Sequence, residues 1–317
     1  MVDAARIVTL SLNPAIDQTA EIERFTAGRV NRVRRERSDA GGKGVNVASF
    51  LADAGLPATA TGFLGEANQE VFRDLFTRKG IEDRFLRLPG RTRVNVKVVD
   101  PVLDQVTDIN FPGLSPAPAD LARLTETIDA LCAESDWFVL TGRVPDGVPA
   151  GIYVDLIARL KARGKRVLLD TSAAPFAAAV RCRPDAVKPN VHELAELLGR
   201  PLSDQAEVLA AARTLTAGGI DLVVVSMGPD GALFVEGDAA LLAVPPSVAV
   251  KSTVGAGDAM VAGILAGTRR GLDLEGRARL ATAFSLGALG EPGPNLPPAD
   301  AIEAFAARVT IRAQGGH

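Results

Sequence analysis

Cysteine and histidine are almost missing from this chain of 317 residues. The cysteines are Cys132 and Cys182, which lack the close spacing of a zinc site and provide no disulfide framework. The histidines are His192 and His317. So few imidazole groups disfavour catalysis by histidine and a histidine-rich metal centre.

A strong net charge and long apolar runs are also missing. The formal net charge is -3 with both signs interspersed, so no overall field attracts nucleic acid or an anionic membrane. No apolar run approaches the roughly 18 residues that span a bilayer. The N-terminal segment carries Asp3 and Arg6 before a short apolar strand, unlike a signal peptide. We expect a cytoplasmic protein that binds neither nucleic acid nor membrane.

Short apolar runs alternate with longer amphipathic ones along the chain. Alternation of this kind predicts an α/β fold with right-handed crossovers and a mainly parallel sheet covered on both faces. Ligands bind at the carboxyl ends of the strands in such sheets. The predicted strands are 6–12, 58–63, 137–142, 166–170, 185–190 and 222–228, the predicted helices 45–55, 68–80, 150–163 and 204–217, and the predicted proline-rich loops 112–120 and 291–300.

Two segments depart from this alternation. Residues around 15–40 and 92–111 alternate apolar and polar side chains, as Val94 and Val96 illustrate, which is the period of a half-buried strand. We predict that both contribute to a small sheet that covers a site or forms a dimer contact. A sheet extension without function is the alternative. Because no internal repeat or linker occurs, we expect residues 1–317 to form a single domain.

The stretch KSTVGAGDAMVAG, from Lys251 to Gly263, places two glycines before an apolar helical run. Gly255 and Gly257 allow a tight turn whose N–H groups point at one anion, and the dipole of the following helix adds to the attraction. Asp258, directly behind this turn, is either a helix cap or the group that performs chemistry. The stretch alone does not separate these interpretations.

Other nucleotide-binding motifs are absent from the sequence. The G-x-G sequences at 42–44 and 255–257 have Val47 and Met260 where a third glycine would complete a dinucleotide fingerprint. Neither a P-loop nor the protein-kinase signatures occur. A Rossmann dehydrogenase and a P-loop enzyme are therefore disfavoured.

Two N-terminal stretches carry candidates for substrate binding. In AGGKGVNVA (40–48), the glycine pair permits close approach of a ligand and Lys43 supplies a point charge suited to phosphate; a flexible turn with a solvated lysine is the alternative. In SLNPAIDQT (11–19), Asp17 follows a strand and a proline turn. A carboxylate there can accept hydrogen bonds from two vicinal sugar hydroxyls, or it is an ordinary turn aspartate.

Two later stretches fit a nucleotide site. In VKPNVHELAELLG (187–199), Lys188 ends a strand, and Glu193 at a helix start either favours a cation through water or pairs with Asn190 in a reciprocal cap. VVVSMGPDGALFV (223–235) is a buried strand, a Gly-Pro-Asp-Gly turn and a second strand. It is either a plain hairpin or a loop whose backbone binds a nucleotide.

In this order the motifs resemble those of the ribokinase-like (PfkB) carbohydrate kinases, and within that family the 1-phosphofructokinase branch. The segments that carry the resemblance over nearly the whole chain are TLSLNPAID, GRVNRV, AGGKGVNVA, GFLGEANQ, GRTRVNVKV, VKPN, VVVSMGPDGAL and the family signature STVGAGD. The resemblance implies a three-layer α/β fold with a small β-sheet lid, which the segments around 15–40 and 92–111 match. It also implies ATP and Mg²⁺ as cofactors and a phosphosugar as substrate.

The resemblance further implies a role for each matching residue. Asp258 would be the catalytic base, and Asp17 would hold the sugar hydroxyls. The other roles are a backbone anion hole (Gly255, Ala256, Gly257), the sugar's phosphate (Lys43, Arg93), the neighbourhood of the substrate (Arg29, Gly42, Asn46), the ATP site (Lys188, Asn190, Ser226, Gly228, Gly231, Thr253) and Mg²⁺ held through water (Glu193).

Two places depart from the family pattern. In TGRVPDG, Arg143 stands where relatives commonly have a serine before the proline, and it either adds a phosphate contact or points to solvent. The segment EPGPNLPPAD (291–300) matches poorly, so a monovalent-cation site near it is not supported.

The implied activity is phosphorylation of fructose 1-phosphate at its C6 hydroxyl by ATP, giving fructose 1,6-bisphosphate. Tagatose 6-phosphate and fructose 6-phosphate are alternative substrates, and a nucleoside kinase or a non-catalytic phosphosugar sensor are more distant alternatives. Because Asp258 would sit at a helix N-terminus, we expect a lowered pKa and a weak base that takes its proton late. Exposed strand edges favour a homodimer formed through the lid.

Overall fold

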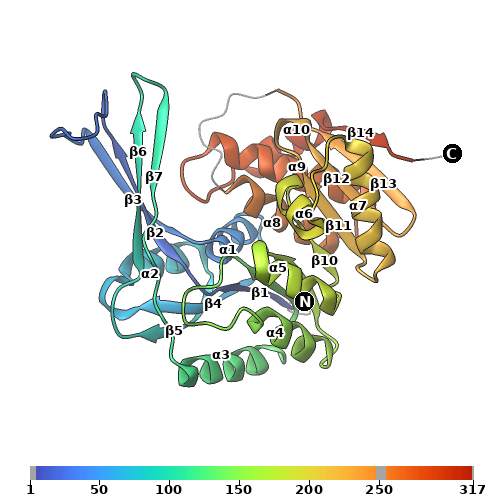
Figure 1. Cartoon of the computed structure of the whole chain (residues 1–317), viewed down its shortest axis with the longest axis horizontal. Helices are drawn as coiled ribbons and strands as arrows, with labels where there is room; N and C mark the ends of the chain where they lie inside the picture. Colours follow the sequence, from blue (N-terminus) through green and yellow to red (C-terminus); the bar gives the residue numbers. More distant parts are fainter. Residues whose placement is uncertain (1–4, 248–254, 316–317) are drawn as a thin grey trace.

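The computed structural model describes residues 5–247 and 255–315 and has the predicted α/β architecture (Figure 1). Its centre is one ten-stranded sheet. In spatial order the strands are β14 (Thr310–Ala313), β13 (Ala239–Val244), β12 (Ala232–Glu236), β11 (Leu222–Ser226), β10 (Ala186–Val187), β9 (Arg166–Asp170), β8 (Ser135–Thr141), β1 (Arg6–Ser11), β4 (Ala58–Gly65) and β5 (Glu82–Leu88).

This sheet is parallel from β5 to β11 and antiparallel from β11 to β14. Parallel neighbours need a long crossover, which the helices supply. The short turn at η3 (Gly228–Asp230) instead returns the chain directly, so β12 must run back beside β11. The mainly parallel sheet is confirmed, and the segment 223–235 does form a hairpin.

Helices cover both faces of the sheet and complete three layers. Strand side chains alternate between two hydrophobic cores, with Val224 in one and Val223 and Val225 in the other. The first core packs against α1 (Lys43–Asp53), α2 (Glu70–Lys79), α8 (Ala256–Arg269), α9 (Leu274–Gly290) and α10 (Ala299–Arg308), and the second against α3 (Pro118–Leu131), α4 (Ile152–Lys161), α5 (Ala173–Ala179), α6 (Val191–Leu198) and α7 (Gln205–Ala217). Short 3-10 helices lie at η1 (Glu66–Asn68) and η2 (Val180–Cys182). Among the residues described, no helix is long and apolar enough to cross a membrane.

Several predicted boundaries differ from the structure, and two of these differences have a clear physical cause. The strand expected over 185–190 is limited to β10, because Pro189 lacks an N–H for the ladder and the chain turns there into α6. Helix α3 begins at Pro118, inside the loop expected over 112–120. Proline suits the first turn of a helix, and the Asp120 carboxylate accepts a hydrogen bond from the Ala117 N–H (2.9 Å), which caps that turn.

A second sheet of four strands, called the lid below, stands apart at one side of the body (Figure 1). Its spatial order is β3 (Arg35–Gly41), β2 (Ala15–Glu21), β6 (Arg93–Asp100) and β7 (Gln105–Ile109). The two segments expected to leave the α/β body thus meet, with β2 and β6 paired in parallel. Because β2 follows β1 directly, the lid is rooted at the carboxyl end of β1, where ligands bind in such folds.

Candidate active site

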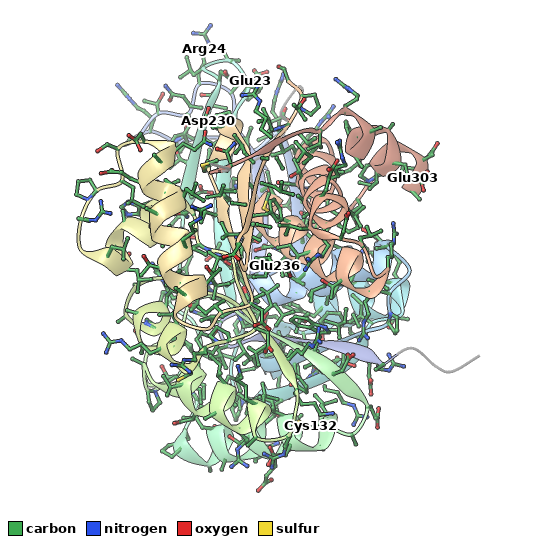
Figure 2. The ribbon with its side chains drawn as sticks, turned by 90° about the vertical axis from the view of Figure 1, so that its right-hand side faces the viewer. Glu23, Arg24, Cys132, Asp230, Glu236 and Glu303 are labelled. Carbon is green, nitrogen blue, oxygen red and sulfur yellow. The ribbon has the colours of Figure 1, made fainter. Side chains whose placement is uncertain are left out.

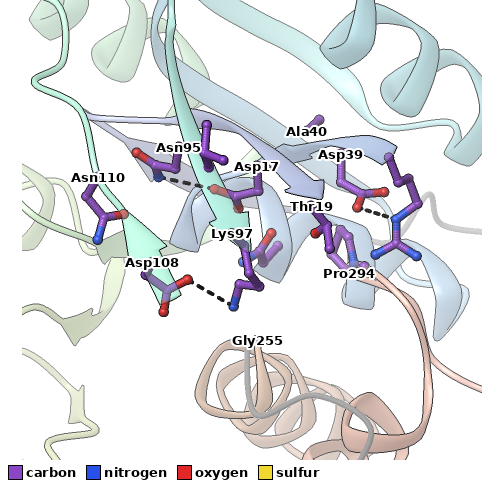
Figure 3. Close-up of a pocket in the computed structure, with 14 residues that line it drawn as sticks. Asp17, Thr19, Asp39, Ala40, Asn95, Lys97, Asp108, Asn110, Gly255 and Pro294 are labelled. Carbon is purple, nitrogen blue, oxygen red and sulfur yellow. Dashed lines mark hydrogen bonds and ion pairs between the residues drawn. The ribbon is translucent and has the colours of Figure 1, made fainter. Parts of the chain in front are cut away.

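A pocket lies between the lid and the N-terminal end of α8 (Figure 3). The lid contributes Asp17 and Asn95, α1 contributes Asn46, and the start of α8 contributes Gly255. Pro294, from the segment that follows α9, completes one wall. The fold therefore gathers distant parts of the chain at the edge where a parallel sheet binds its ligand.

Asp17 lies on β2 with its carboxylate inside this pocket (Figure 3). Its Oδ1 accepts a hydrogen bond from Asn95 Nδ2 at 3.1 Å. Burial raises the pKa of Asp17, although Asn95, Arg93 and Lys97 oppose the shift. A side chain at Gly41 would come within 2.1 Å of Asp17 Oδ2, so the first glycine of the Gly-Gly pair makes room for this carboxylate.

Asp258 lies in the first turn of α8 and is only 7% exposed. Its Oδ2 accepts a hydrogen bond from Asn46 Nδ2 at 2.8 Å. Burial raises the pKa of Asp258 to about 6, with a further contribution from the negative charge of Asp170 and opposition from Lys43 and Lys188. The expected lowering of this pKa is therefore wrong, because desolvation outweighs the favourable helix N-terminus. A carboxyl group with such a pKa suits general-base catalysis near neutral pH.

The N-terminus of α8 supplies the predicted turn. Gly255 precedes the helix with φ 84°, a conformation that favours glycine, and Ala256 begins the helix. The first N–H groups of a helix have no acceptor within it, and its dipole attracts negative charge. A Cβ added at Gly257 would lie 3.4 Å from Lys188 Nζ, so this lysine stands beside the same turn. Backbone N–H groups and a cation thus converge on one place.

Asp170, at the end of β9, is a site residue that sequence reasoning missed. It is 1% exposed, and its Oδ1 and Oδ2 lie 3.4 and 3.3 Å from Lys43 Nζ. Its Oδ1 is also 3.4 Å from Lys188 Nζ, and Thr141 Oγ1 donates to its Oδ2 at 3.3 Å. Burial alone would raise the pKa of Asp170, but the two lysines hold it below its usual range. The sequence offers one signal, an aspartate at the end of a predicted strand.

Lys43 and Lys188 both form an ion pair with Asp170 and also lie near the carboxyl group of Asp258. Asp170 is also the main reason that the pKa of Lys43 lies above its usual range, which keeps this lysine charged. The Lys43 side chain is 39% exposed, whereas that of Lys188 is 6% exposed. Lys43 is therefore the more accessible cation of this pair, although it is not among the residues that line the pocket.

Arg93 begins β6 and is held by the backbone. Its Nε, Nη1 and Nη2 donate to the carbonyl oxygens of Pro14 (3.2 Å), Phe111 (3.3 Å) and Asn13 (3.0 Å). Burial lowers the pKa of Arg93, Asp17 raises it, and the positive charge of Arg143 lowers it again. A phosphate bound near both arginines would offset this repulsion.

Arg29 lies outside this arrangement. It is exposed in the connection 22–34 between β2 and β3 and, like Lys43, Arg93 and Arg143, is not among the residues that line the pocket. The side chains of Glu23 and Arg24, from the same connection, stand at the end of the molecule opposite Cys132 (Figure 2). The hydrogen bonds and ion pairs of the described residues include none from the Arg29 side chain to Lys43 or Arg93, so nothing in this chain links Arg29 to the site.

Asn190 and Glu193 form the reciprocal helix cap at the start of α6. Asn190 Oδ1 accepts from the Glu193 N–H at 2.8 Å, and Glu193 Oε2 accepts from the Asn190 N–H at 2.9 Å. The negative charge of Glu193 also contributes to the raised pKa of Lys43, after the larger effects of Asp170 and Asp258. Ser226, at the end of β11, pairs with Asn190 in an isolated bridge. The cap and a role toward a cation are thus compatible.

A second pocket of about 540 Å³ also borders the N-terminal end of α8. Gly228 and Ala256 line it together with Met260, and α9 contributes Leu286. Its mostly apolar wall and size are typical of small-molecule sites. The sequence reasoning missed the part from α9, which carries no polar motif. Thr253 lies outside the described residues.

The hairpin turn beside this pocket depends on Gly231. This residue has φ 100°, and a Cβ there would come within 2.0 Å of the Ala243 carbonyl oxygen. The Gly231 carbonyl accepts a hydrogen bond from the Met227 N–H at 2.8 Å. The turn therefore holds Gly228 at the pocket edge.

Comparison with known proteins gives a family and two informative relatives, one of them in two solved structures. The profile of the pfkB family carbohydrate kinases matches residues 10–301. The chain belongs to this family. A 1-phosphofructokinase of Rhodobacter capsulatus is 53% identical over 97% of this chain and 98% of its own. The phosphofructokinase-2 of Escherichia coli in complex with fructose-6-phosphate has a TM-score of 0.88 at 28% identity, covering 96% of this chain and 98% of that one. Its tetrameric inhibited form has a TM-score of 0.87 with the same identity and coverage.

Membership makes this chain a carbohydrate kinase, an enzyme that transfers a phosphoryl group from ATP to a sugar. The resemblance on which the sequence analysis relied is confirmed, and so is the three-layer fold with a small separate sheet. Two pockets that both border the α8 N-terminus fit a kinase, because its two substrates must meet at one transferring group.

Proposed function

We propose that this carbohydrate kinase phosphorylates fructose 1-phosphate at its C6 hydroxyl, forming fructose 1,6-bisphosphate and ADP. The observation that carries the proposal is Asp258, a buried carboxyl group with a pKa raised to about 6, in the glycine-bounded first turn of α8. The 53% identity to a 1-phosphofructokinase supports this choice of sugar phosphate.

The reaction exchanges one phosphorus–oxygen bond for another. The bond between the C6 oxygen and the γ-phosphorus forms, while the bond from that phosphorus to the bridging oxygen of ADP breaks. The C6 hydroxyl proton passes to the Asp258 carboxylate, which Asn46 orients through its 2.8 Å hydrogen bond. Since the transition state is loose, the proton is removed late, and the main catalytic contribution is the positioning of the C6 oxygen and the γ-phosphoryl group.

The first N–H groups of α8, at Gly255, Ala256 and Gly257, form the proposed anion hole. Their positions are fixed before the reaction, so they stabilise charge on the transferring group without reorganisation. Asp258 then combines two functions, because its carboxylate orients the acceptor while the turn in front of it holds the phosphoryl group.

We assign the sugar end of the site to the lid and α1. Asp17 accepts hydrogen bonds from the sugar hydroxyls, beside Gly42 and Asn46. The sugar's own phosphate binds Arg93 and Arg143, whose charges repel each other without it. Lys43 adds its exposed charge between Asp170 and the phosphate.

The nucleotide end uses the second pocket and the strand ends beside it. Gly228 and Ala256 line the apolar pocket for the base, and Lys188 stands next to the α8 turn for the phosphates. The complete proposed ATP site comprises Lys188, Asn190, Ser226, Gly228, Gly231 and Thr253.

Glu193 is the proposed contact to Mg²⁺ through water. The described residues contain no cluster of three or more metal-binding side chains. Mg²⁺ in kinases is held by one or two carboxylates, waters and substrate phosphates, so a single carboxylate fits this ion. When bound, it neutralises charge on the β- and γ-phosphates.

We further propose a homodimer formed through the lid of a cytoplasmic enzyme. Exposed large apolar side chains gather on the lid and its connections, namely Val30, Val33, Val102, Leu103, Val106, Ile109 and Phe111. Such a patch favours burial against a second copy, and an exposed arginine in the connection 22–34, Arg29, would then reach a partner's site. Sedimentation as a dimer is expected, and sedimentation as a monomer at working concentration would contradict the proposed dimer.

We place the enzyme in the cytoplasm because both of its proposed substrates, ATP and a phosphosugar, are charged.

The activity is tested by ADP release from ATP with a panel of phosphosugars. The highest kcat/KM is expected for fructose 1-phosphate, compared with tagatose 6-phosphate, fructose 6-phosphate and adenosine. Asp258→Asn, prepared identically, measures contamination by other kinases. Preference for a 6-phosphate would change the assigned substrate, and turnover of adenosine alone would establish a nucleoside kinase. No turnover with any acceptor would favour a sensor.

A further inference from the structure

The lid presents its polar side chains in rows, because paired residues in neighbouring strands lie side by side and residues two apart share a face. The middle row contains Asp17 and Asn95, the hydrogen-bonded pair of the sugar pocket. The rows, from the root of the lid outward, are Gly41, Ala15 and Arg93; Asp39, Asp17 and Asn95; Arg37, Thr19, Lys97 and Asp108.

This arrangement places a cation on each side of the row that holds the sugar. Arg93 and Lys97 are two residues before and after Asn95 on the same strand, and both lower the pKa of Asp17 against its burial. Their Cα atoms are about 13 Å apart along the strand. A ligand centred on Asp17 thus has Arg93 near one end and Lys97 near the other.

Lys97 faces the reacting end of the pocket. Its side chain extends from β6 across the pocket, in the direction of Gly255 at the start of α8 (Figure 3). Both residues line the same cavity. The end of the sugar that approaches Asp258 therefore lies between a fixed helix N-terminus and a cation of the lid.

Lys97 forms only a weak ion pair, with Asp108. Lys97 Nζ lies 3.4 Å from Asp108 Oδ1, and the Asp108 side chain is 54% exposed. By contrast, Arg37 in the same row donates to Asp39 Oδ2 at 2.7 Å. Exposed ion pairs contribute only about 0–1 kcal/mol, so a phosphoryl group competes easily for Lys97.

We propose that Lys97 binds the phosphoryl group during its transfer to the C6 oxygen and remains on the new phosphate of the product. The proposal rests on the proposed function, and it adds a lid cation opposite the α8 anion hole. Negative charge spreads over the oxygens of the transferring group, so cations on two sides stabilise it more than the ground state. Fructose 1-phosphate alone, with its phosphate at Arg93, does not need Lys97.

The test compares Lys97→Met with Asp108→Asn, which removes the same ion pair but leaves the lysine free. Lys97→Met should lower kcat by about 10²–10³-fold, the usual cost of one lost transition-state donor, with KM for fructose 1-phosphate nearly unchanged. Asp108→Asn should keep or raise kcat. Lys97→Arg should recover part of the loss, and thermal melting of each variant checks its folding.

A binding measurement gives a second readout. By calorimetry, Lys97→Met should weaken binding of fructose 1,6-bisphosphate by about tenfold or more, as expected for loss of a charged contact, and leave fructose 1-phosphate unaffected. An unchanged kcat in Lys97→Met, or an equal loss in Asp108→Asn, overturns the role of Lys97.

The wild-type assay separates this inference from the proposed function. If the wild type prefers another phosphosugar, the same comparison is made with that sugar and its bisphosphate. If the wild type is active and Lys97→Met has a normal kcat, only the role of Lys97 is rejected. A wild type that phosphorylates no phosphosugar rejects both proposals.

Discussion

The floor of the active site and the lid hold their charges in opposite ways. In the floor, Asp170 and Lys188 have side chains 1% and 6% exposed, and Asp258 is buried beside them. In the lid, the side chains of Lys97 and Asp108 are 23% and 54% exposed. Buried charges are fixed before a ligand arrives, whereas exposed ones exchange partners at little cost.

This difference separates two requirements of phosphoryl transfer. Electrostatic stabilisation works best when dipoles and charges need not reorganise, which the floor provides. A substrate must also enter and a doubly phosphorylated product must leave, which requires contacts that form and break. The contrast between fixed and exchangeable charge can be tested by substitutions in the floor and by substitutions in the lid.

Replacement of the base should have the largest effect. Asp258→Asn should lower kcat by about 10²–10⁴-fold, the usual contribution of a general base, while ATP still binds. Because the pKa of Asp258 is raised, its charged form destabilises the fold, and this cost grows as pH rises toward about 6. The variant should therefore be more stable above this pH, by about 1–3 kcal/mol. Steady-state kinetics and denaturant unfolding measure the two effects.

Near-normal kcat in this variant would return Asp258 to the role of a helix cap. Loss of both stability and activity would contradict the buried, unfavourable carboxylate. The expected combination, less activity with more stability, separates a catalytic group from a structural one.

Breaking the floor should destabilise the protein more than breaking the lid. Asp170→Asn leaves Lys43 and Lys188 without their counterion, and loss of one partner from a buried pair costs about 3–5 kcal/mol. Asp108→Asn is the matched lid variant and should cost less than about 1 kcal/mol. Because the pKa of Asp170 is lowered, its stabilisation is present above pH 3.8 and is lost as pH falls below it. Urea unfolding at neutral pH compares the variants, and equal losses would reject the contrast.

Removal of a phosphate contact should act mainly on substrate binding. Arg93→Ala should raise KM for the phosphosugar by about 10- to 100-fold, as expected for a charge-assisted contact, with a smaller change in kcat. Arg143→Ala should raise KM less, because Arg143 is exposed and lacks the three carbonyl contacts that orient Arg93. Initial-rate measurements with varied phosphosugar test both. An unchanged KM would remove the arginine concerned from the site.

The smallest effect concerns pH. Since Asp258 must be ionised to accept a proton, kcat/KM should fall about tenfold per pH unit below pH 6. The hydrogen bond from Asn46 lowers this pKa, so Asn46→Ala should move the acidic limb to higher pH. A pH profile of kcat/KM measures the shift. A limb at pH 4 in the wild type would contradict the raised pKa.

Local patterns of the sequence predict most of the body and the lid. The alternation of residues around 15–40 and 92–111 indicates strands, because period-two patterns depend only on neighbouring residues. The parallel pairing of β2 with β6 does not follow from them, since it joins segments far apart in the chain. The β11–β12 hairpin was one of the two interpretations of 223–235, but the antiparallel pairing of β13 with β12 and β14 was not predicted.

The site shows the same limit in its electrostatics. The sequence places Asp258 at a helix start and so predicts a lowered pKa, but the opposite shift depends on burial and on Asp170. Asp170 meets Lys43 across 127 positions of the chain, a contact that only the order of the strands creates. Motifs identify which residues carry chemistry, whereas their protonation depends on neighbours from other motifs.

The Asp17 carboxylate depends on a second position of the sequence, Gly41, which leaves the space that it fills. Any side chain there would fall within 2.1 Å of the Asp17 carboxylate. In a library of single substitutions selected for growth on the sugar, we expect position 41 to tolerate as few residues as position 17. The two positions would form one genetic unit, in which the aspartate supplies the oxygens and the glycine supplies the space.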